Sequence, residues 1–175
     1  MVLLTVTGPP GSGKSTACKL IRERTGLDYI YAGQIFRERA KELGLSLEEF
    51  GSLCERDSSF DVDLDMRMLE RARSGDAILE GRMIGALCWR DGIPAYKVYV
   101  DADPKVRARR VQEREGGDLS IIEDAILERE RSERMRYLGL YGLDHMDRKI
   151  YDLWVDSSKL TPEGVVDKIL ERVGI

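Results

Sequence analysis

The residue types best suited to chemistry stand together near the start of the chain. They fit the pattern G-x-x-x-x-G-K-[ST] with the residues Gly8, Pro9, Pro10, Gly11, Ser12, Gly13, Lys14, Ser15 and Thr16. Glycines at this spacing let the backbone fold tightly, so that several N–H groups point at one anion. The lysine serves the β- and γ-phosphates of a nucleotide, and the serine hydroxyl is a Mg²⁺ ligand. We therefore expect these residues to bind ATP, with Lys14 catalytic and Ser15 on the metal.

The segments on either side of this pattern have the character that a phosphate-binding loop requires. Residues 1–7 form a short apolar run with β-branched side chains, typical of a buried parallel strand. After the loop, Ala17, Leu20 and Ile21 recur at helical spacing. A helix that begins at the lysine would add its positive dipole end. The order of strand, loop and helix favours this interpretation over an ordinary glycine-rich turn.

The rest of the chain alternates between apolar runs and helical patterns. Further strands are predicted at 28–31, 77–80, 97–101 and 151–155. Helices are predicted at 33–43, at about 61–74, from Pro104 to Gly116 and from Pro162 to about Val173. Two more helices are expected to begin at capping boxes, one at Ser46–Glu49 and a second at Ser120–Glu123. This alternation predicts an α/β protein with a central five-stranded parallel sheet covered by helices on both faces.

Length and composition limit what kind of protein this is. The chain has 175 residues, 42% hydrophobic and 34% charged, which fits one domain spanning residues 1–175. No apolar run approaches the roughly 20 residues of a membrane span, and the N-terminal run is too short for most secretory signals. The net charge of −4 argues against nucleic acid as the main partner. Three cysteines without a C-x-x-C pair favour reduced thiols, so we expect a cytoplasmic protein. We also expect a monomer with small-molecule substrates.

Five segments, in order and over nearly the whole length, resemble the nucleoside monophosphate kinases. Within them the chain looks most like the compact archaeal-type cytidylate kinases. The segments are the loop Gly8–Thr16, Tyr31–Arg37, Leu79–Arg82, Val98–Ala102 leading into Arg109-Arg110, and Arg129–Arg136. The loop alone is widespread, whereas the five in this order are specific.

The resemblance implies an activity and a set of roles. It implies a P-loop kinase that transfers the γ-phosphoryl group of ATP to CMP, and to dCMP, with Mg²⁺. Acceptor-binding helices would lie at about 33–74, and a short lid at about 110–129. Arg109 would stack on the adenine. Arg114 and Arg129 would be catalytic with Lys14, and Arg114 would reach the ATP phosphates. CMP would be bound by Gly33, Arg37, Arg82, Arg129, Glu133 and Arg136.

Several of these roles also follow from chemistry, with alternatives that the sequence leaves open. Arg129, Glu133 and Arg136 stand at i, i+4 and i+7 on one helix face, and offer two phosphate or base donors and one acceptor for ribose. The alternative is a solvated ion-pair ladder. Glu80 would hold Mg²⁺ through water or serve a structural role. The charged, glycine-containing segment 114–118 would act as a lid or simply connect two helices.

Departures from related kinases bear on the acceptor. Adenylate kinases usually carry Thr-Gly and a D-G-F-P-R string where this chain has Ala32-Gly33 and Glu80–Ile84, which argues against AMP. The acceptor-binding insertion of the larger bacterial cytidylate kinases is also missing. Two other functions are weighed against the cytidylate kinase: another small-acceptor kinase, acting on AMP, UMP, shikimate or a sugar acid, and a nucleotide-operated switch with slow ATP hydrolysis. The clustered arginines favour a charged phosphate acceptor.

Overall fold

A parallel five-stranded sheet forms the centre of the computed structural model, which describes residues 2–175 except the side chain of Glu48. The strands lie in the order β2-β3-β1-β4-β5, and every neighbouring pair is parallel. Their bounds are β1 Leu3–Thr7, β2 Asp28–Tyr31, β3 Ala77–Glu80, β4 Tyr96–Asp101 and β5 Leu153–Asp156. The predicted sheet is confirmed, with each strand within two residues of its expected bounds.

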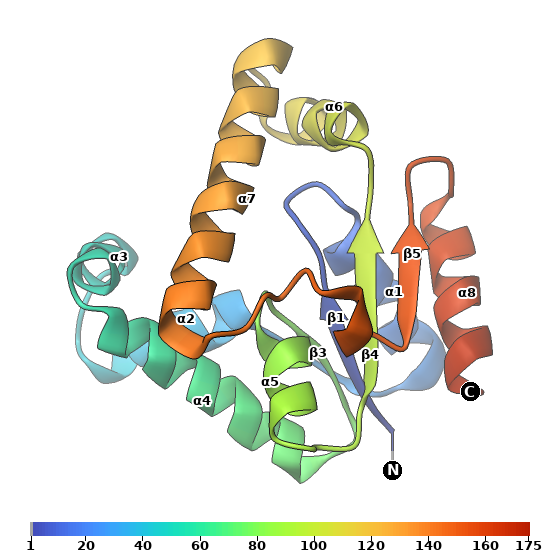
Figure 1. The fold of residues 1–175 in the computed structure, drawn as a ribbon, viewed down its shortest axis with the longest axis horizontal. Coiled ribbons are helices and arrows are strands. Elements are labelled where there is room, and N and C mark those ends of the chain that lie inside the picture. The colour runs from blue at the N-terminus through green and yellow to red at the C-terminus, as the bar shows by residue number, and fades with distance from the viewer. Residues whose placement is uncertain (1) are drawn as a thin grey trace.

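Helices cover both faces of this sheet, which explains why its central strands are mainly apolar. Leu4 and Ile78 belong to the core beneath α1 (Lys14–Thr25) and α8 (Pro162–Val173). Their neighbours Leu3 and Leu79 belong to the opposite core, beneath α4 (Ser58–Ser74) and α5 (Ile84–Arg90). Figure 1 shows α5 in front of the sheet and α1 behind it.

The remaining helices test the capping predictions. They are α2 Ala32–Glu42, α3 Leu47–Arg56, α6 Pro104–Glu115, α7 Leu119–Tyr141 and the short 3₁₀ helix η1 Arg148–Ile150. The capping box at Ser46 is confirmed, because Ser46 and Glu49 each accept a hydrogen bond from the other's backbone N–H. The second predicted box is wrong: Ser120 lies inside α7, and the cap is Asp118, whose carboxylate accepts from the N–H of Ile121 at 3.1 Å.

One helix boundary and one whole helix differ from the sequence prediction. Helix α4 begins at Ser58 rather than near Asp61, because Asp57 accepts a hydrogen bond from the N–H of Ser59 and caps it. Helix α5 was not predicted. It is only seven residues long, almost wholly buried, and has no side-chain cap, so neither periodicity nor a capping signal marks it.

Helices α6 and α7 form a hairpin beyond the carboxyl ends of the strands (Figure 1). A small apolar cluster of Ala108, Val111 and Ile126 holds the two helices together, separate from the cores of the sheet. Between them the chain turns at Gly116 and Gly117, with φ of 76° and 103°. In the part of the chain that the structure describes, no helix has the length and apolar character needed to cross a membrane.

His145 supports the end of α7 that lies nearest the sheet. Its ring meets Tyr137 edge-on with 5.3 Å between ring centroids, and its backbone carbonyl accepts a hydrogen bond from the Tyr151 hydroxyl. The imidazole is 3% exposed, and its Nδ1 has no hydrogen-bond partner among the described residues. Burial lowers the pKa of His145 to about 4, so the folded protein holds this ring neutral.

The neutral, buried His145 predicts a loss of stability in acid. Between pH 6.5 and about 4 the unfolded imidazole binds a proton and the folded one does not, so unfolding becomes easier as the pH falls. This group should lower the free energy of unfolding by about 2–3 kcal/mol across that window. In His145→Phe the loss is absent, so urea unfolding from pH 7 to pH 4 should show a smaller decline than in the wild type. Equal declines in both proteins would contradict a neutral buried imidazole.

Candidate active site

The loop between β1 and α1 has the geometry of a phosphate cradle. Its glycines are required by close packing as well as by backbone angle. A Cβ on Gly8 would lie 2.1 Å from the Val100 carbonyl oxygen, and one on Gly11, at φ 76°, would lie 2.7 Å from the Arg107 carbonyl oxygen. Helix α1 begins at Lys14, as predicted. The loop therefore presents backbone N–H groups and a helix N-terminus to the same space.

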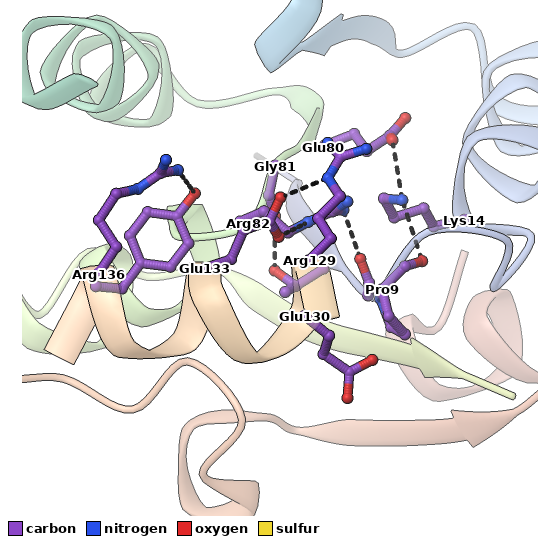
Figure 2. Close-up of polar contacts among 12 residues, drawn as sticks. Pro9, Lys14, Glu80, Gly81, Arg82, Arg129, Glu130, Glu133 and Arg136 are labelled. Atoms are coloured by element: carbon purple, nitrogen blue, oxygen red, sulfur yellow. Dashed lines mark hydrogen bonds and ion pairs between the residues drawn. The ribbon is translucent and has the colours of Figure 1, made fainter. Parts of the chain in front are cut away.

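Lys14 and Ser15 meet Glu80 from the end of β3. The Lys14 Nζ donates to the Pro9 carbonyl oxygen at 3.4 Å and lies 3.9 Å from the Glu80 Oε1 (Figure 2). The Ser15 hydroxyl donates to the same Oε1 at 2.8 Å, and the Tyr29 hydroxyl donates to the Oε2. Burial, and secondarily Arg82, lowers the pKa of Lys14 to about 8. A phosphate anion would restore the ordinary preference of this lysine for its charged form.

Ser15 and Glu80, the predicted Mg²⁺ ligands, lie side by side. Both supply hard oxygen ligands, and their oxygens already lie within hydrogen-bond distance. Ser15 is exposed, whereas Glu80 is only 9% exposed. Mg²⁺ favours such sites, in which few protein ligands are joined by substrate phosphates.

A cavity of about 600 Å³, here called the loop cavity, opens over the loop. Its lining consists of Pro10, Gly11, Ser12, Gly13, Lys14, Ser15, Thr16, Arg82, Arg110, Arg114, Arg129, Ser157, Leu160, Pro162 and Val165. Gly8 and Pro9 are buried and do not line it. On α6, Arg114 lines the cavity, whereas Arg109 is exposed and outside the lining.

Arg110, the neighbour of Arg109, was missed by sequence reasoning. Its guanidinium donates to the carbonyl oxygens of Gly11 and Ser12 at 3.2 Å, and to the hydroxyl and carbonyl oxygens of Ser157. Spacing on α6 carries the signal. Arg107, Arg110 and Arg114 stand at i, i+3 and i+7 on one helix face, and Arg109 stands on another. Arg107, 2% exposed, forms an ion pair with Glu130 at 2.9 Å.

A second cavity of about 390 Å³, here called the α4 cavity, lies beside the first. Its lining consists of Lys14, Tyr31, Ala32, Gly33, Phe36, Asp61, Leu64, Asp65, Met68, Glu80, Gly81, Arg82, Arg129, Glu133, Arg136 and Tyr137. Lys14, Arg82 and Arg129 line both cavities and form a cationic wall between them. Two anions placed on either side of this wall would share its positive charge.

Glu133 holds two of these cations together. The Arg82 Nε donates to its Oε2 at 2.8 Å, and the Arg129 Nε donates to its Oε1 at 2.9 Å (Figure 2). A second Arg82 nitrogen donates to the Gly8 carbonyl oxygen at 2.6 Å. Burial alone would raise the pKa of Glu133, but the two arginines outweigh it and lower the pKa below its ordinary value. The i,i+4 pair of Arg129 with Glu133 is therefore buried at the carboxylate, which is 12% exposed, and open to solvent at the arginine, which is 63% exposed.

Arg136 and Arg37, both predicted to bind CMP, lie differently with respect to the α4 cavity. Arg136 is part of its lining and lies over the Tyr137 ring, 5.2 Å from the centroid. Arg37 is exposed and outside the lining; its guanidinium lies over the Tyr31 ring and donates to the Tyr31 hydroxyl. It therefore sits directly behind a residue that lines the cavity.

Sequence reasoning also missed two acidic residues of α4, Asp61 and Asp65, which line the α4 cavity. The Tyr141 hydroxyl donates to the Asp65 Oδ2 at 2.6 Å. Burial, with a smaller contribution from Asp61, raises the pKa of Asp65 to about 6. Their spacing of four on a helix was visible in the sequence, but which helix face turns inward is set by tertiary packing.

Comparison with known proteins matches this arrangement to kinases. A family model described as an AAA domain matches residues 7–126. Among solved structures, a shikimate kinase from Bacteroides thetaiotaomicron has a TM-score of 0.67 at 14% identity, covering 99% of each chain. A gluconokinase from Sinorhizobium meliloti has a TM-score of 0.63 at 18% identity, covering 99% of this chain and 91% of its own. These likenesses show the P-loop kinase fold.

Curated relatives are much more similar in sequence. A cytidylate kinase from Methanococcus maripaludis is 41% identical over 172 residues, which is 98% of this chain and 96% of the relative. Another, from Pyrococcus horikoshii, is 44% identical over 94% of this chain and 84% of the relative. With this identity over nearly the whole length, together with the phosphate-binding loop and two adjoining cavities, the chain belongs to the cytidylate kinase family.

Proposed function

We propose that this protein is an ATP-dependent cytidylate kinase, which transfers the γ-phosphoryl group of ATP to CMP, and to dCMP, with Mg²⁺. The observation that carries the proposal is the cationic wall of Lys14, Arg82 and Arg129, shared by two cavities. ATP would occupy the loop cavity and CMP the α4 cavity, so that donor and acceptor phosphates meet at this wall. In-line transfer needs this juxtaposition and little covalent help from the protein.

The residues of the cationic wall would bind different phosphates. Lys14, at the N-terminus of α1, would hold the β- and γ-phosphates together with the backbone N–H groups of the loop. Arg82 and Arg129 would turn from Glu133 toward the phosphates, because a phosphate offers each guanidinium a doubly charged partner. Glu133 would then be free to accept hydrogen bonds from the ribose of CMP. Charge developing on the transferring group would then be met by Lys14, the N–H groups of the loop and the two arginines.

Ser15 and Glu80 would hold Mg²⁺, the serine directly and the carboxylate through water. When bound, the ion neutralises charge on the β- and γ-phosphates and fixes their orientation. The Tyr29 hydroxyl, which donates to Glu80, keeps this carboxylate aimed at the loop.

The hairpin of α6 and α7 would act as the lid, with residues 110–129 as its moving part. Arg114 and Arg129 come from its two helices and line the loop cavity. Arg114 is 65% exposed and pairs with its neighbour Glu115, so it is free to reach a phosphate when the hairpin closes. The separate apolar cluster of the hairpin lets it move as a unit, and closure would exclude water from the transfer.

The rival functions predict a different acceptor. A shikimate or sugar-acid kinase needs one or two cations for a carboxylate and polar groups for hydroxyls. The α4 cavity instead has Lys14, Arg82, Arg129 and Arg136 among its lining, which suits a phosphate dianion together with a base or ribose. A slow ATPase switch would need no second cavity against the cationic wall.

ADP formation with and without acceptors tests the proposed function. We expect strong dependence on CMP or dCMP, a weaker response to UMP and AMP, and none to shikimate or gluconate. Chelation of Mg²⁺ should abolish the activity. An ADP rate that does not depend on any monophosphate would favour the switch, and a preference for shikimate or gluconate would favour the sugar-acid kinases.

The lysine of the loop gives the first mutational prediction. Lys14→Ala should lower kcat by at least about a hundredfold, because the transferring phosphoryl group loses a charge held in a partly buried site. Lys19→Ala, at an exposed position of the same helix, is the control and should keep its activity. Steady-state kinetics and thermal melts of both variants make the comparison. Near-normal turnover by a folded Lys14→Ala protein would remove this lysine from the mechanism.

Glu133 gives the second mutational prediction. Glu133→Gln keeps the shape but removes the charge that organises Arg82 and Arg129 and would accept from the ribose. The KM for CMP should rise by about tenfold or more, whereas the KM for ATP should change little. Glu128→Gln is the control, because Glu128 lies on the same helix and is 70% exposed. Equal effects of the two variants on the KM for CMP would place Glu133 outside the acceptor site.

A further inference from the structure

A buried ion pair closes the base of the hairpin that α6 and α7 form. The Arg107 Nη2 on α6 lies 2.9 Å from the Glu130 Oε2 on α7, and the Arg107 side chain is only 2% exposed. In the part of the chain that the structure describes, no other ion pair joins these two helices. Arg107 precedes and Glu130 follows residues 110–129, the proposed moving part of the lid. The pair therefore lies where a moving lid would join the rest of the protein.

The Arg107 end of the pair is fixed to the sheet and to the phosphate-binding loop. Its Nε donates to the carbonyl oxygen of Ala102, directly after β4, at 3.0 Å. Its own backbone carbonyl oxygen packs against Gly11, where a Cβ would come within 2.7 Å of it. One turn further along α6, Arg110 donates to the carbonyl oxygens of Gly11 and Ser12. The first turns of α6 are thus anchored to the loop, and a side chain that pairs with Arg107 is held relative to the loop as well.

The Glu130 end of the pair sets how α7 is turned about its own axis. Successive residues of an α-helix point about 100° apart, so a helix that directs Glu130 toward α6 directs Arg129 elsewhere. Glu133 follows Arg129 by four residues and shares its face. Figure 2 shows Glu130 leaving α7 on a different side from Glu133. Arg129 lines both cavities, whereas Glu130 lines neither.

Stability is a weak reason to keep two charges at this position. Both ions lose hydration on burial, which offsets much of their attraction. The remaining Arg107 nitrogen, Nη1, is buried and has no hydrogen-bond partner among the described residues. The neighbouring contacts between the helices are made by the small apolar cluster of Ala108, Val111 and Ile126. Apolar side chains pack in several rotations, whereas two charges that must meet allow few, so the pair restricts the rotation of α7.

We propose that Arg107 and Glu130 are positioning residues, whose ion pair turns α7 so that Arg129 faces the transferring phosphoryl group. This assignment rests on the proposed function, in which Arg129 meets the phosphates. The pair stays formed while residues 110–129 move, so each closure of the lid returns Arg129 to the same place. Neither member of the pair lines a cavity, and both act through Arg129.

The first test removes the charge of Glu130 and keeps its shape. In Glu130→Gln the kcat with CMP should fall by at least about tenfold, whereas the KM for ATP should stay within about threefold, because Arg129 acts on the transition state. Glu128→Gln is the matched control: the same change on the same helix, at a carboxylate that is 70% exposed and pairs with Arg131. A kcat within about twofold of the wild type in a folded Glu130→Gln protein would overturn the proposal.

The second test asks whether Glu130 acts through Arg129. In an Arg129→Ala protein no guanidinium is left to position, so adding Glu130→Gln should lower kcat by no more than about twofold. A merely structural role would lower kcat by the same factor in both backgrounds. Independent, multiplying losses in the double variant would therefore contradict positioning through Arg129.

A change at the other end of the pair repeats the test if Glu130→Gln does not fold. Arg107→Lys keeps the positive charge, but one ammonium group cannot replace a planar fork that meets both the Ala102 oxygen and Glu130. We expect a loss of kcat that again disappears in the Arg129→Ala background. Full turnover by a folded Arg107→Lys protein would count against the pair as the positioning element.

Failure of the inference is distinguishable from failure of the proposed function. If the wild type transfers phosphate to CMP and the variants of Arg107 and Glu130 do so equally fast, only the role of the ion pair is wrong. If the wild type transfers no phosphate to CMP, the proposed function fails and the inference fails with it. Thermal melts of Glu130→Gln, Glu128→Gln and Arg107→Lys separate either outcome from loss of fold.

Discussion

The structure depends on one electrostatic problem: several cations must stand together before any phosphate arrives. Lys14, Arg82 and Arg129 line the boundary between two cavities, and like charges in a partly buried site repel one another strongly. Glu80 and Glu133 relieve this repulsion, the first beside Lys14 and the second between the two arginines. In the proposed function, the phosphates of two nucleotides would displace these carboxylates, because they carry more charge.

The fold brings these five side chains together from three distant parts of the chain. Lys14 follows β1, Glu80 and Arg82 lie at and just after the end of β3, and Arg129 and Glu133 come from α7. Neighbouring parallel strands end at the same edge of a sheet, so the pairing of β1 with β3 sets the first two groups side by side. The hydrogen bond from Arg82 to the Gly8 carbonyl oxygen ties the end of β3 to the loop. Packing of Tyr137 against His145 supports α7 on the opposite side.

The sequence predicted the parts of this site that local chemistry specifies. The phosphate-binding loop needs its own glycines, lysine and serine in a fixed order, and the central strands are mainly apolar because both their faces are buried. What it did not predict depends on which way a helix faces. Arg109 and Arg110 are adjacent and chemically identical, yet only Arg110 touches the loop, because α6 is oriented by the buried Arg107 and the apolar cluster with α7. Helix α5 has no local signal, since its burial on nearly every side removes the amphipathic pattern.

The two cavities differ in how far the fold constrains them. The loop cavity is lined mainly by the loop, α6 and the segment after β5. Gly11 has no room for a side chain and Gly13 has a φ of 89°, so the shape of this cavity follows largely from the phosphate-binding loop itself. The outer part of the α4 cavity is made by side chains of α2, α4 and α7, none of which the loop restricts. Shikimate kinase and gluconokinase share this fold at 14% and 18% identity. The fold alone therefore does not fix the lining of the α4 cavity, because the helix faces around it can change without disturbing the phosphate-binding loop.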